Sequence, residues 1–213
     1  MPLRENRDYS ILNLHLPCDL LSKSWVFPMQ LKFPVSEIQT WYLRYFKESR
    51  PVDLVHEARI ETVTALEVCA RGWYTKAELV EVCRWKNPRS QARVGQNPES
   101  FIQSVTASAL STSDERLRIE VLTLLEGVSW PAASLLLHFG IPNLYPVLDS
   151  RSLWSLSIDN PPVSAQYFQY EFWWEYTQTC RNLAKEAGVS MRSLDRALWQ
   201  YARVNQRPSY PHV

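Results

Sequence analysis

The amino-acid sequence predicts an all-α fold, and three observations lead to this prediction. Only five glycines interrupt the 213 residues. Apolar side chains recur mainly at the spacing of three and four residues that is typical of amphipathic helices. No segment shows a convincing alternation of apolar and polar residues, which would indicate a half-buried strand. With 46% hydrophobic residues, the chain is also long enough to bury a substantial core without a metal or a disulfide.

The order of the elements follows from capping residues, prolines and glycines along the chain. Residues 1–35 contain four prolines, and we expect them to form an extended segment packed on a multi-helix domain of residues 36–213. About nine helices are expected in that domain. They are predicted over residues 36–48, 51–72, 76–85, 99–110, 114–125, 131–140, a short helix that begins at 149 or 150, 164–187 and 190–204.

Specific residues predict where these helices begin and end. Thr75 and Glu78 have the spacing of a capping box. The other starts are assigned to N-cap side chains or to a proline in the first turn, namely Ser36, Pro51 with Asp53, Asn97 with Pro98, Ser113, Pro131, Asp149 or Ser150, Ser164 and Ser190. The predicted stops are Gly72, Gly127 and Gly140. The side chains of the 114–125 helix expected to face the core are Leu117, Val121, Leu124 and Leu125.

The charge distribution excludes a globally basic protein. The formal net charge is +1, so any contact with nucleic acid must come from a local patch. Two stretches could supply one. Residues 82–98 contain four basic residues and no acidic one, and residues 181–213 contain six basic residues against two acidic ones. Either stretch could also be a solvated face of a helix.

The four cysteines do not predict a metal centre. Their spacing fits neither a zinc site nor an iron–sulfur loop, so we expect reduced thiols, no metal cluster and no cofactor; they are Cys18, Cys69, Cys83 and Cys180. The first residues lack the apolar core of a signal peptide, and no run approaches the roughly 18 apolar residues that span a bilayer. An intracellular, cytoplasmic monomer without membrane contact is therefore expected.

The most informative pattern lies in residues 122–156. Residues 125–133 read L-E-G-V-S-W-P-A-A, and they resemble the hairpin of the helix-hairpin-helix (HhH-GPD) DNA glycosylase superfamily, roughly L-P-G-V-G-x-x-x-A. Residues 145–150, Y-P-V-L-D-S, resemble the segment that carries the catalytic aspartate of that family. The resemblance covers about residues 70–160. It implies a hairpin over residues 114–140 and a catalytic segment over residues 145–157.

The resemblance implies a DNA glycosylase that flips a base out of double-stranded DNA and hydrolyses its N-glycosidic bond. Asp149 would be catalytic, because an ionised carboxylate stabilises the oxocarbenium-like charge on the sugar and orients the attacking water. Gly127 and the backbone N–H groups of Val128, Ser129 and Trp130 would bind the DNA backbone, since a glycine turn and a helix N-terminus admit a phosphate.

Residues 85–89 form a second candidate constellation, in which an aromatic ring stands beside two cations and an amide. Such a group suits stacking on a base, although Trp85 could equally be a core residue. We assign a base pocket to Trp85, Asn87 and Trp130. Further DNA contacts are assigned to Lys86, Arg89, Arg93 and Arg151, the last of which could instead pair with Asp149. The aromatic run 167–176 and His138 are expected to be structural.

Two departures from the family pattern affect the prediction. Ser129 replaces the second hairpin glycine. Pro131 stands where bifunctional members carry a lysine nucleophile, which implies a monofunctional enzyme that leaves an abasic site uncut. The substrate stays open between alkylated or oxidised purines, mismatched adenine and the bulky modified cytosines of bacteriophages, and so does the role in repair or phage defence. The alternatives are a non-catalytic DNA-binding module and a protein-interaction module in which Asp149 is only an N-cap.

Overall fold

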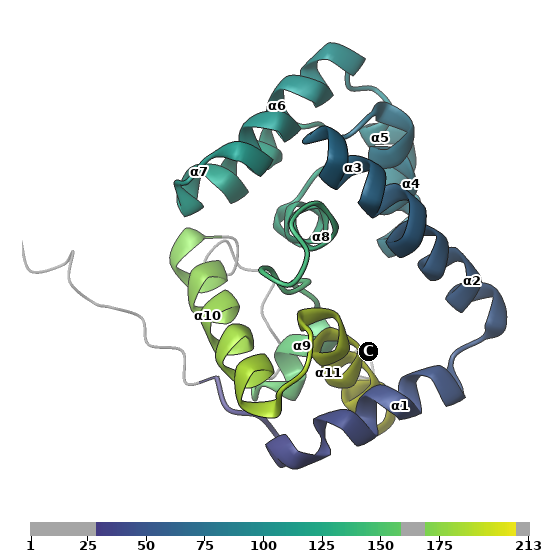
Figure 1. Ribbon diagram of the computed structural model, residues 1–213, viewed down its shortest axis with the longest axis vertical. Helices are drawn as coiled ribbons and strands as arrows, with labels where there is room; N and C mark the ends of the chain where they lie inside the picture. The colour runs from purple at the N-terminus through teal and green to yellow at the C-terminus, as the bar shows by residue number, and fades with distance from the viewer. Residues whose placement is uncertain (1–28, 159–168, 208–213) are drawn as a thin grey trace, which may run out of the picture.

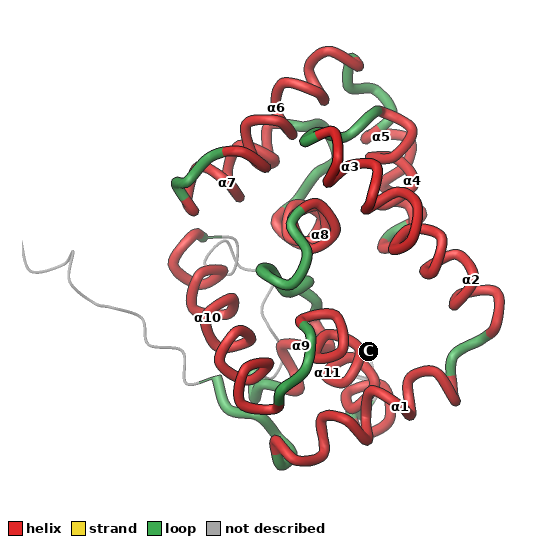
Figure 2. The backbone as a smooth tube through the Cα atoms, in the orientation of Figure 1, coloured by secondary structure: helices red, strands yellow, loops and turns green. Residues whose placement is uncertain are grey.

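Helices form the regular structure of this protein, which is described by a computed structural model over residues 29–158 and 169–207. No strand occurs in these ranges, so the all-α prediction is confirmed (Figures 1 and 2). The α-helices are α1 (Ile38–Glu48), α2 (Pro51–Arg59), α3 (Ala65–Arg71), α4 (Lys76–Lys86), α5 (Gln91–Val94), α6 (Glu99–Ser111), α7 (Glu115–Glu120), α8 (Trp130–Gly140), α9 (Ser150–Ser155), α10 (Tyr170–Ala187) and α11 (Met191–Asn205).

The nine expected helices all have a counterpart in the described ranges. A π-helical turn, Ile60–Thr64, joins α2 to α3, so the expected helix over residues 51–72 is continuous. The short helix α5 was not expected, because four residues are too few to show a hydrophobic period. The expected helix start at Ser164, the segment 1–28 and Cys18 lie outside the described residues.

Several predicted helix ends are confirmed by the hydrogen bonds that form them. Thr75 Oγ1 accepts from the backbone N–H of Glu78 at 3.3 Å, and the Glu78 carboxylate accepts from the N–H of Thr75 at 2.7 Å. Ser190 caps α11 by accepting from the N–H of Ser193 at 3.0 Å. Gly72 ends α3 with φ +83°, a left-handed conformation that favours glycine.

Besides Asn97, whose place as the N-cap of α6 is taken by Pro98, two predicted caps are wrong by one or two residues. Ser36 lies inside a 3₁₀ turn, Val35–Glu37, that precedes α1, and its side chain caps nothing. Asp114, and not Ser113, caps α7 by accepting from the N–H of Leu117 at 2.8 Å. Before α7 several polar residues stand side by side, and the sequence does not show that Asp114 is the one with the extended backbone of an N-cap. Before α1 the chain enters a 3₁₀ turn after Pro34, so Ser36 already lies inside a helical turn.

The face assigned to the 114–125 helix is also wrong in part. Leu117 and Leu124 are 49% and 64% exposed. The buried side chains of this region are Ile119, Leu122 and Leu125. Their spacing of three residues suits the 3₁₀ turn, Val121–Leu124, that continues α7, because a 3₁₀ helix has three residues per turn.

The core consists of two hydrophobic clusters around α8, which Figure 1 shows end-on in the centre of the molecule. One cluster joins α8 to the helices from α3 to α6, and the other joins α1, α9, α10 and α11. Trp130 packs against both clusters. Phe172, Trp173 and Tyr176 of α10 are fully buried, which confirms the structural role expected for the aromatic run in its described part.

The described end of the expected lead-in, residues 29–34, has no regular secondary structure and is attached to the domain. The backbone N–H groups of Gln30 and Lys32 donate to the carbonyls of Leu156 and Ser155, at 3.1 and 2.9 Å. Phe33 is buried in the second cluster. Over residues 29–158 and 169–207, we find no helix with the length and apolar character required to cross a bilayer.

Candidate functional site

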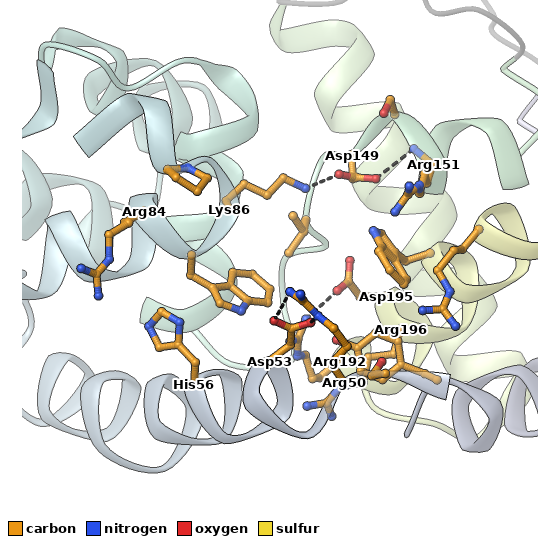
Figure 3. Close-up of a pocket in the computed structure, with 18 residues that line it drawn as sticks. Arg50, Asp53, His56, Arg84, Lys86, Asp149, Arg151, Arg192, Asp195 and Arg196 are labelled. Carbon is orange, nitrogen blue, oxygen red and sulfur yellow. Dashed lines mark hydrogen bonds and ion pairs between the residues drawn. The ribbon is translucent and has the colours of Figure 1, made fainter. Parts of the chain in front are cut away.

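A cavity of about 950 Å³ lies between α4 on one side and α9 and α11 on the other, with α1 and α2 along its edge (Figure 3). Its lining is strongly cationic. Among the described residues that line it, seven lysines and arginines face three aspartates. The basic residues are Arg50, Arg84, Lys86, Arg151, Arg192, Arg196 and Arg203, and the acidic ones are Asp53, Asp149 and Asp195.

Asp149 lies at the junction of the cavity and the N-terminus of α9. Its Oδ1 accepts from the backbone N–H of Arg151 at 2.9 Å, so the residue is the predicted N-cap. Its Oδ2 forms an ion pair with Lys86 Nζ, which reaches across from α4 (Figure 3). The two side chains are 17% and 22% exposed, so this pair is largely shielded from solvent.

The electrostatic surroundings keep Asp149 ionised. Burial on its own would raise the pKa of this carboxyl group. The charge and hydrogen bond of Lys86, together with the N–H of Arg151, outweigh the burial and hold the pKa of Asp149 below its ordinary value. A carboxylate is therefore present in the cavity at neutral pH.

The segment before Asp149 is anchored from two helices. Helices α8 and α10 supply the side chains, and each fixes a different backbone group of the segment. The bonds join His138 Nδ1 to the Tyr145 carbonyl at 2.7 Å, the Leu148 N–H to Ser134 Oγ at 2.8 Å, and the Tyr176 hydroxyl to the Val147 carbonyl at 2.8 Å. The backbone that delivers Asp149 is thus held at three successive points.

His138 has the structural role expected from its apolar helix. Burial lowers the pKa of its ring to about 3, so the imidazole is neutral at physiological pH. Its bonding partner is a backbone carbonyl, which only accepts hydrogen bonds, so Nδ1 carries the proton. His138 therefore positions the segment that precedes Asp149.

A buried cluster of ion pairs supports the cavity from α2 and α11. Arg192 donates to Glu61 and to Asp195, both at 2.6 Å, and also binds Glu57. Arg196 donates to Glu57 at 2.8 Å. Burial raises the pKa of Asp195 to about 6 against the opposing effect of Arg192. The cavity therefore holds two carboxyl groups, Asp149 and Asp195, whose pKa values are shifted in opposite directions.

Two tryptophans line the cavity, and both have cationic neighbours. The Trp85 ring packs edge-on against Phe139, with an interplanar angle of 74° and centroids 5.9 Å apart, and the Arg192 guanidinium lies 5.4 Å from the Trp85 ring centre. Trp85 thus takes part in both the cavity wall and the core. The Trp199 ring lies near the guanidinium groups of Arg151 and Arg203, at 4.6 and 5.4 Å.

The predicted hairpin turn is tied to the segment between α5 and α6. The sequence predicted that Asn97 caps α6, but Pro98 takes that position. The amide of Asn97 donates to the Glu126 carbonyl at 2.9 Å and accepts from the Glu126 N–H at 2.8 Å. The side chain therefore satisfies two backbone groups of the turn, which a cap at α6 would leave unpaired. Arg93 is ion-paired with the Glu126 carboxylate at 2.6 Å.

Gly127 is required at this turn for two reasons. Its φ is +80°, and a Cβ atom there would lie 2.9 Å from both Arg93 Cβ and the backbone nitrogen of Val94. The close approach of α5 therefore contributes to the need for glycine, independently of any phosphate contact.

The variant Gly127→Ala is expected to be less stable than Gly72→Ala. Both positions are left-handed, which costs alanine about 1–2 kcal/mol, but nothing lies within 4 Å of a Cβ at Gly72. Overpacking against α5 should cost Gly127→Ala a further 1–3 kcal/mol or so. Urea unfolding measures the free energy of unfolding of the two variants. An equal loss of stability in both would show that α5 moves away freely from a Cβ atom at position 127.

The structure brings together four of the predicted site residues, namely Trp85, Lys86, Asp149 and Arg151, in the cavity. The described residues that line it do not include Asn87, Arg89, Arg93, Gly127, Val128, Ser129 or Trp130. Val128 is buried in the core, and Asn87 and Arg89 are exposed and joined to each other at 3.1 Å. Ser129, the N-cap of α8, is exposed.

Sequence reasoning did not single out the α11 side chains of the cavity, Arg192, Asp195, Arg196, Trp199 and Arg203. The signal that could have found them is the basic stretch over residues 181–213. Three of its six basic residues line the cavity, and they recur at the helical spacing of four and seven residues.

The described part of the chain contains no group of three or more His, Cys, Asp or Glu side chains that could hold a metal ion. Comparison of the chain with protein-family models, curated proteins and solved structures finds no match.

Proposed function

We propose that this protein is a DNA glycosylase that hydrolyses the N-glycosidic bond of a damaged or modified nucleotide flipped out of duplex DNA. The observation that carries the proposal is the position of Asp149. An ionised, largely shielded carboxylate lies in a cavity whose other charged groups are mostly cationic. This combination suits a polyanionic ligand that develops positive charge at one atom.

Asp149 would act on the sugar of the flipped nucleotide. As the bond from C1′ to the base nitrogen breaks, its electron pair leaves with the base and positive charge develops on C1′ and the ring oxygen. The carboxylate stabilises this charge and orients a water molecule whose oxygen attacks C1′. The water supplies one proton to the medium and its hydroxyl to the sugar, and the product is an abasic site.

The cations of the cavity would position the DNA backbone. Arg151 stands two residues after Asp149, and Arg50, Arg84 and Arg203 lie in the same lining. Contacts of this kind fix the register of the duplex without reading its sequence. The family's lysine position is occupied by Pro131, so the hydrolysis itself requires no covalent intermediate.

The second candidate function is a non-catalytic DNA-binding module. The observation in its favour is that both Asp149 oxygens already have partners, Lys86 and the N–H of Arg151. An N-cap in an ion pair needs no catalytic role to be explained.

Incubation with defined substrates separates the two functions. The panel contains duplexes with alkylated and oxidised purines, mismatched adenine and modified cytosines, together with modified phage DNA. We expect wild-type protein to create alkali-labile abasic sites on one class of substrate. Binding to every duplex without any abasic site would leave the binding module as the better account.

Arg151→Ala is expected to weaken duplex binding in a salt-dependent way. Loss of one phosphate contact should reduce the slope of log K against log salt concentration by about 0.9. Fluorescence anisotropy at several salt concentrations measures this slope. Arg116→Ala is the matched control, since Arg116 lies on α7 outside the cavity lining and pairs with Glu120. An unchanged slope in Arg151→Ala would remove Arg151 from the interface.

A further inference from the structure

The cavity holds a second buried carboxyl group, Asp195 of α11, to which the proposed reaction has so far given no role. Its Oδ2 accepts a hydrogen bond from Arg192 at 2.6 Å. Its Oδ1 has no hydrogen-bond partner in residues 29–158 and 169–207, and it is not one of the side-chain atoms there that are both sealed from solvent and unpartnered. One oxygen of Asp195 is therefore bound to an arginine, and the other is open to a ligand in the cavity.

The bond to Arg192 determines which oxygen carries the proton when Asp195 is neutral. A guanidinium group only donates hydrogen bonds, so Oδ2 stays free of a proton. The proton of the neutral acid is therefore on Oδ1, the oxygen without a protein partner. After Oδ1 loses this proton, the carboxylate keeps its ion pair with Arg192. Asp195 is thus arranged to donate a proton into the cavity and to be stabilised as an anion afterwards.

Both protonation states of Asp195 are populated near neutral pH. Burial raises the pKa of this carboxyl group to about 6. Nearby cations favour its ionised form, and nearby carboxylates oppose it. The titratable groups around it come from several helices, namely Arg192 of α11, Lys86 of α4, Asp149 before α9, Glu57 of α2, and Tyr176 and Cys180 of α10. The last two stay uncharged, because burial raises the pKa of both groups.

On the proposed function, the two carboxyl groups suit the two products of bond cleavage. The ionised Asp149 stabilises the positive charge on the sugar. The base takes the electron pair of the broken bond, and an uncharged base leaves as an anion unless it receives a proton. In Figure 3 the Asp195 carboxyl group lies between Asp149 and Arg192, close enough for the charge of Asp149 to oppose its ionisation.

The charge of the lining bears on which bases enter the cavity. Seven lysines and arginines face three aspartates in the described lining. A base that already carries a positive charge, such as 7-methylguanine, would enter against electrostatic repulsion. Such a base also leaves without a proton, since the electron pair of the broken bond neutralises it. A proton donor in a cationic cavity therefore suits an uncharged base.

We propose that Asp195 is the general acid that protonates the departing base and that the target base is uncharged, an inference that rests on the proposed function. As the bond from C1′ to the base nitrogen breaks, its electron pair stays with the base, and a nitrogen or oxygen of the base takes the proton from Oδ1. Asp195 is left as a carboxylate beside Arg192. Water adds its hydroxyl to C1′, and its other proton replaces, through the medium, the one that Asp195 gave.

Wild-type protein alone provides the first test. In single-turnover assays, the rate on the best uncharged duplex of the panel should fall about tenfold for each pH unit above about pH 7, as the acid form of Asp195 is lost. A duplex with 7-methylguanine at the same position should form no more abasic sites than it does without protein. Oxidised purines, mismatched adenine and modified cytosines are the uncharged candidates.

Asp195→Asn should be about 10²-fold slower than wild type at pH 6, and its remaining rate should no longer depend on pH. The amide keeps an oxygen that can accept from Arg192, so the ion-pair cluster loses a charge and not its shape. The comparison variant is Asp53→Asn. Asp53 also lines the cavity, but both of its oxygens accept from Arg50, whose hydrogen bonds hold the pKa of Asp53 below its ordinary value. Asp53→Asn should keep the fall in rate above pH 7.

Several results would overturn the inference and leave the glycosylase standing. They are base release by wild type at a rate that does not depend on pH, a pH dependence that persists in Asp195→Asn, or faster release of 7-methylguanine than of any uncharged base. A structural role for Asp195 would lower the rate equally at every pH. The wild-type profile needs no variant, so a poorly folded Asp195→Asn would not obscure the result. No base release from any duplex would instead refute the proposed function, and the inference with it.

Discussion

The variant Asp149→Asn is expected to release its target base about 10³-fold more slowly than wild type in single-turnover assays. Asparagine keeps an oxygen that can accept the N–H of Arg151, so the cap of α9 survives and only the charge is lost. Duplex affinity should therefore stay near that of wild type. Equal rates in both proteins would remove Asp149 from the chemistry.

Asp114→Asn is the matched control for this variant. Asp114 caps α7 in the same way that Asp149 caps α9, by accepting a backbone N–H of the first turn at 2.8 Å. It lies outside the cavity lining in the described chain. The control should retain the wild-type rate, and a similar fall in both variants would indicate a capping effect instead of a catalytic one.

The pH dependence of the same reaction follows from the lowered pKa of Asp149. A depressed pKa means that the carboxylate is already ionised above about pH 5, so the rate should not fall between pH 8 and pH 5 through this group. The stability supplied by its ion pair is also present in that range, and it is lost only as the pH falls through the lowered pKa.

The largest stability change is expected for Glu57→Gln. Glu57 is 1% exposed and binds Arg192, Arg196 and the hydroxyl of Tyr45, the last at 2.5 Å. The amide has the shape of the carboxylate without its charge, so two buried guanidinium groups lose a partner. Breaking a buried ion pair in this way costs about 3–5 kcal/mol. For a chain of this length, that corresponds to a fall in Tm of roughly 6–20 °C.

Glu120→Gln provides the comparison for Glu57→Gln. Glu120 pairs with Arg116 on the surface of α7, where the two side chains are 42% and 57% exposed. Such pairs contribute about 0–1 kcal/mol, so calorimetry should find its Tm close to that of wild type. Similar small changes in both variants would show that solvent reaches the cluster between α2 and α11.

The helices were largely predictable from the sequence because their signals are local. The capping box of Thr75 and Glu78 and the cap at Ser190 act within four residues, and both are found as expected. These local signals predicted the wrong buried face where the helical period changed. The 3₁₀ turn after α7 shifts the buried face to Ile119, Leu122 and Leu125, and a helical period of 3.6 residues assigned Leu117 and Leu124 instead.

The site was predictable only in part, since its residues come from distant parts of the chain. Asp149 and Lys86 were each singled out, but their ion pair depends on the tertiary fold, which places the last residue of α4 opposite the N-cap of α9. The ion pair between Glu57 and Arg192 was not predictable, because charged residues on an amphipathic helix are assigned to the surface unless a partner is known. Only tertiary structure shows that α2 and α11 face each other.

The three hydrogen bonds that anchor the segment before Asp149 have a consequence for selectivity. On the proposed function, a carboxylate on a backbone fixed in this way would not move to meet its substrate, so the nucleotide would travel the whole distance from the base stack. The free energy of flipping is then the cost of unstacking and unpairing the base in the DNA, and this cost is smallest for a base whose pairing is already weakened. Selection between damaged and intact bases would therefore begin with how easily the duplex releases each base, before any group of the protein touches the base.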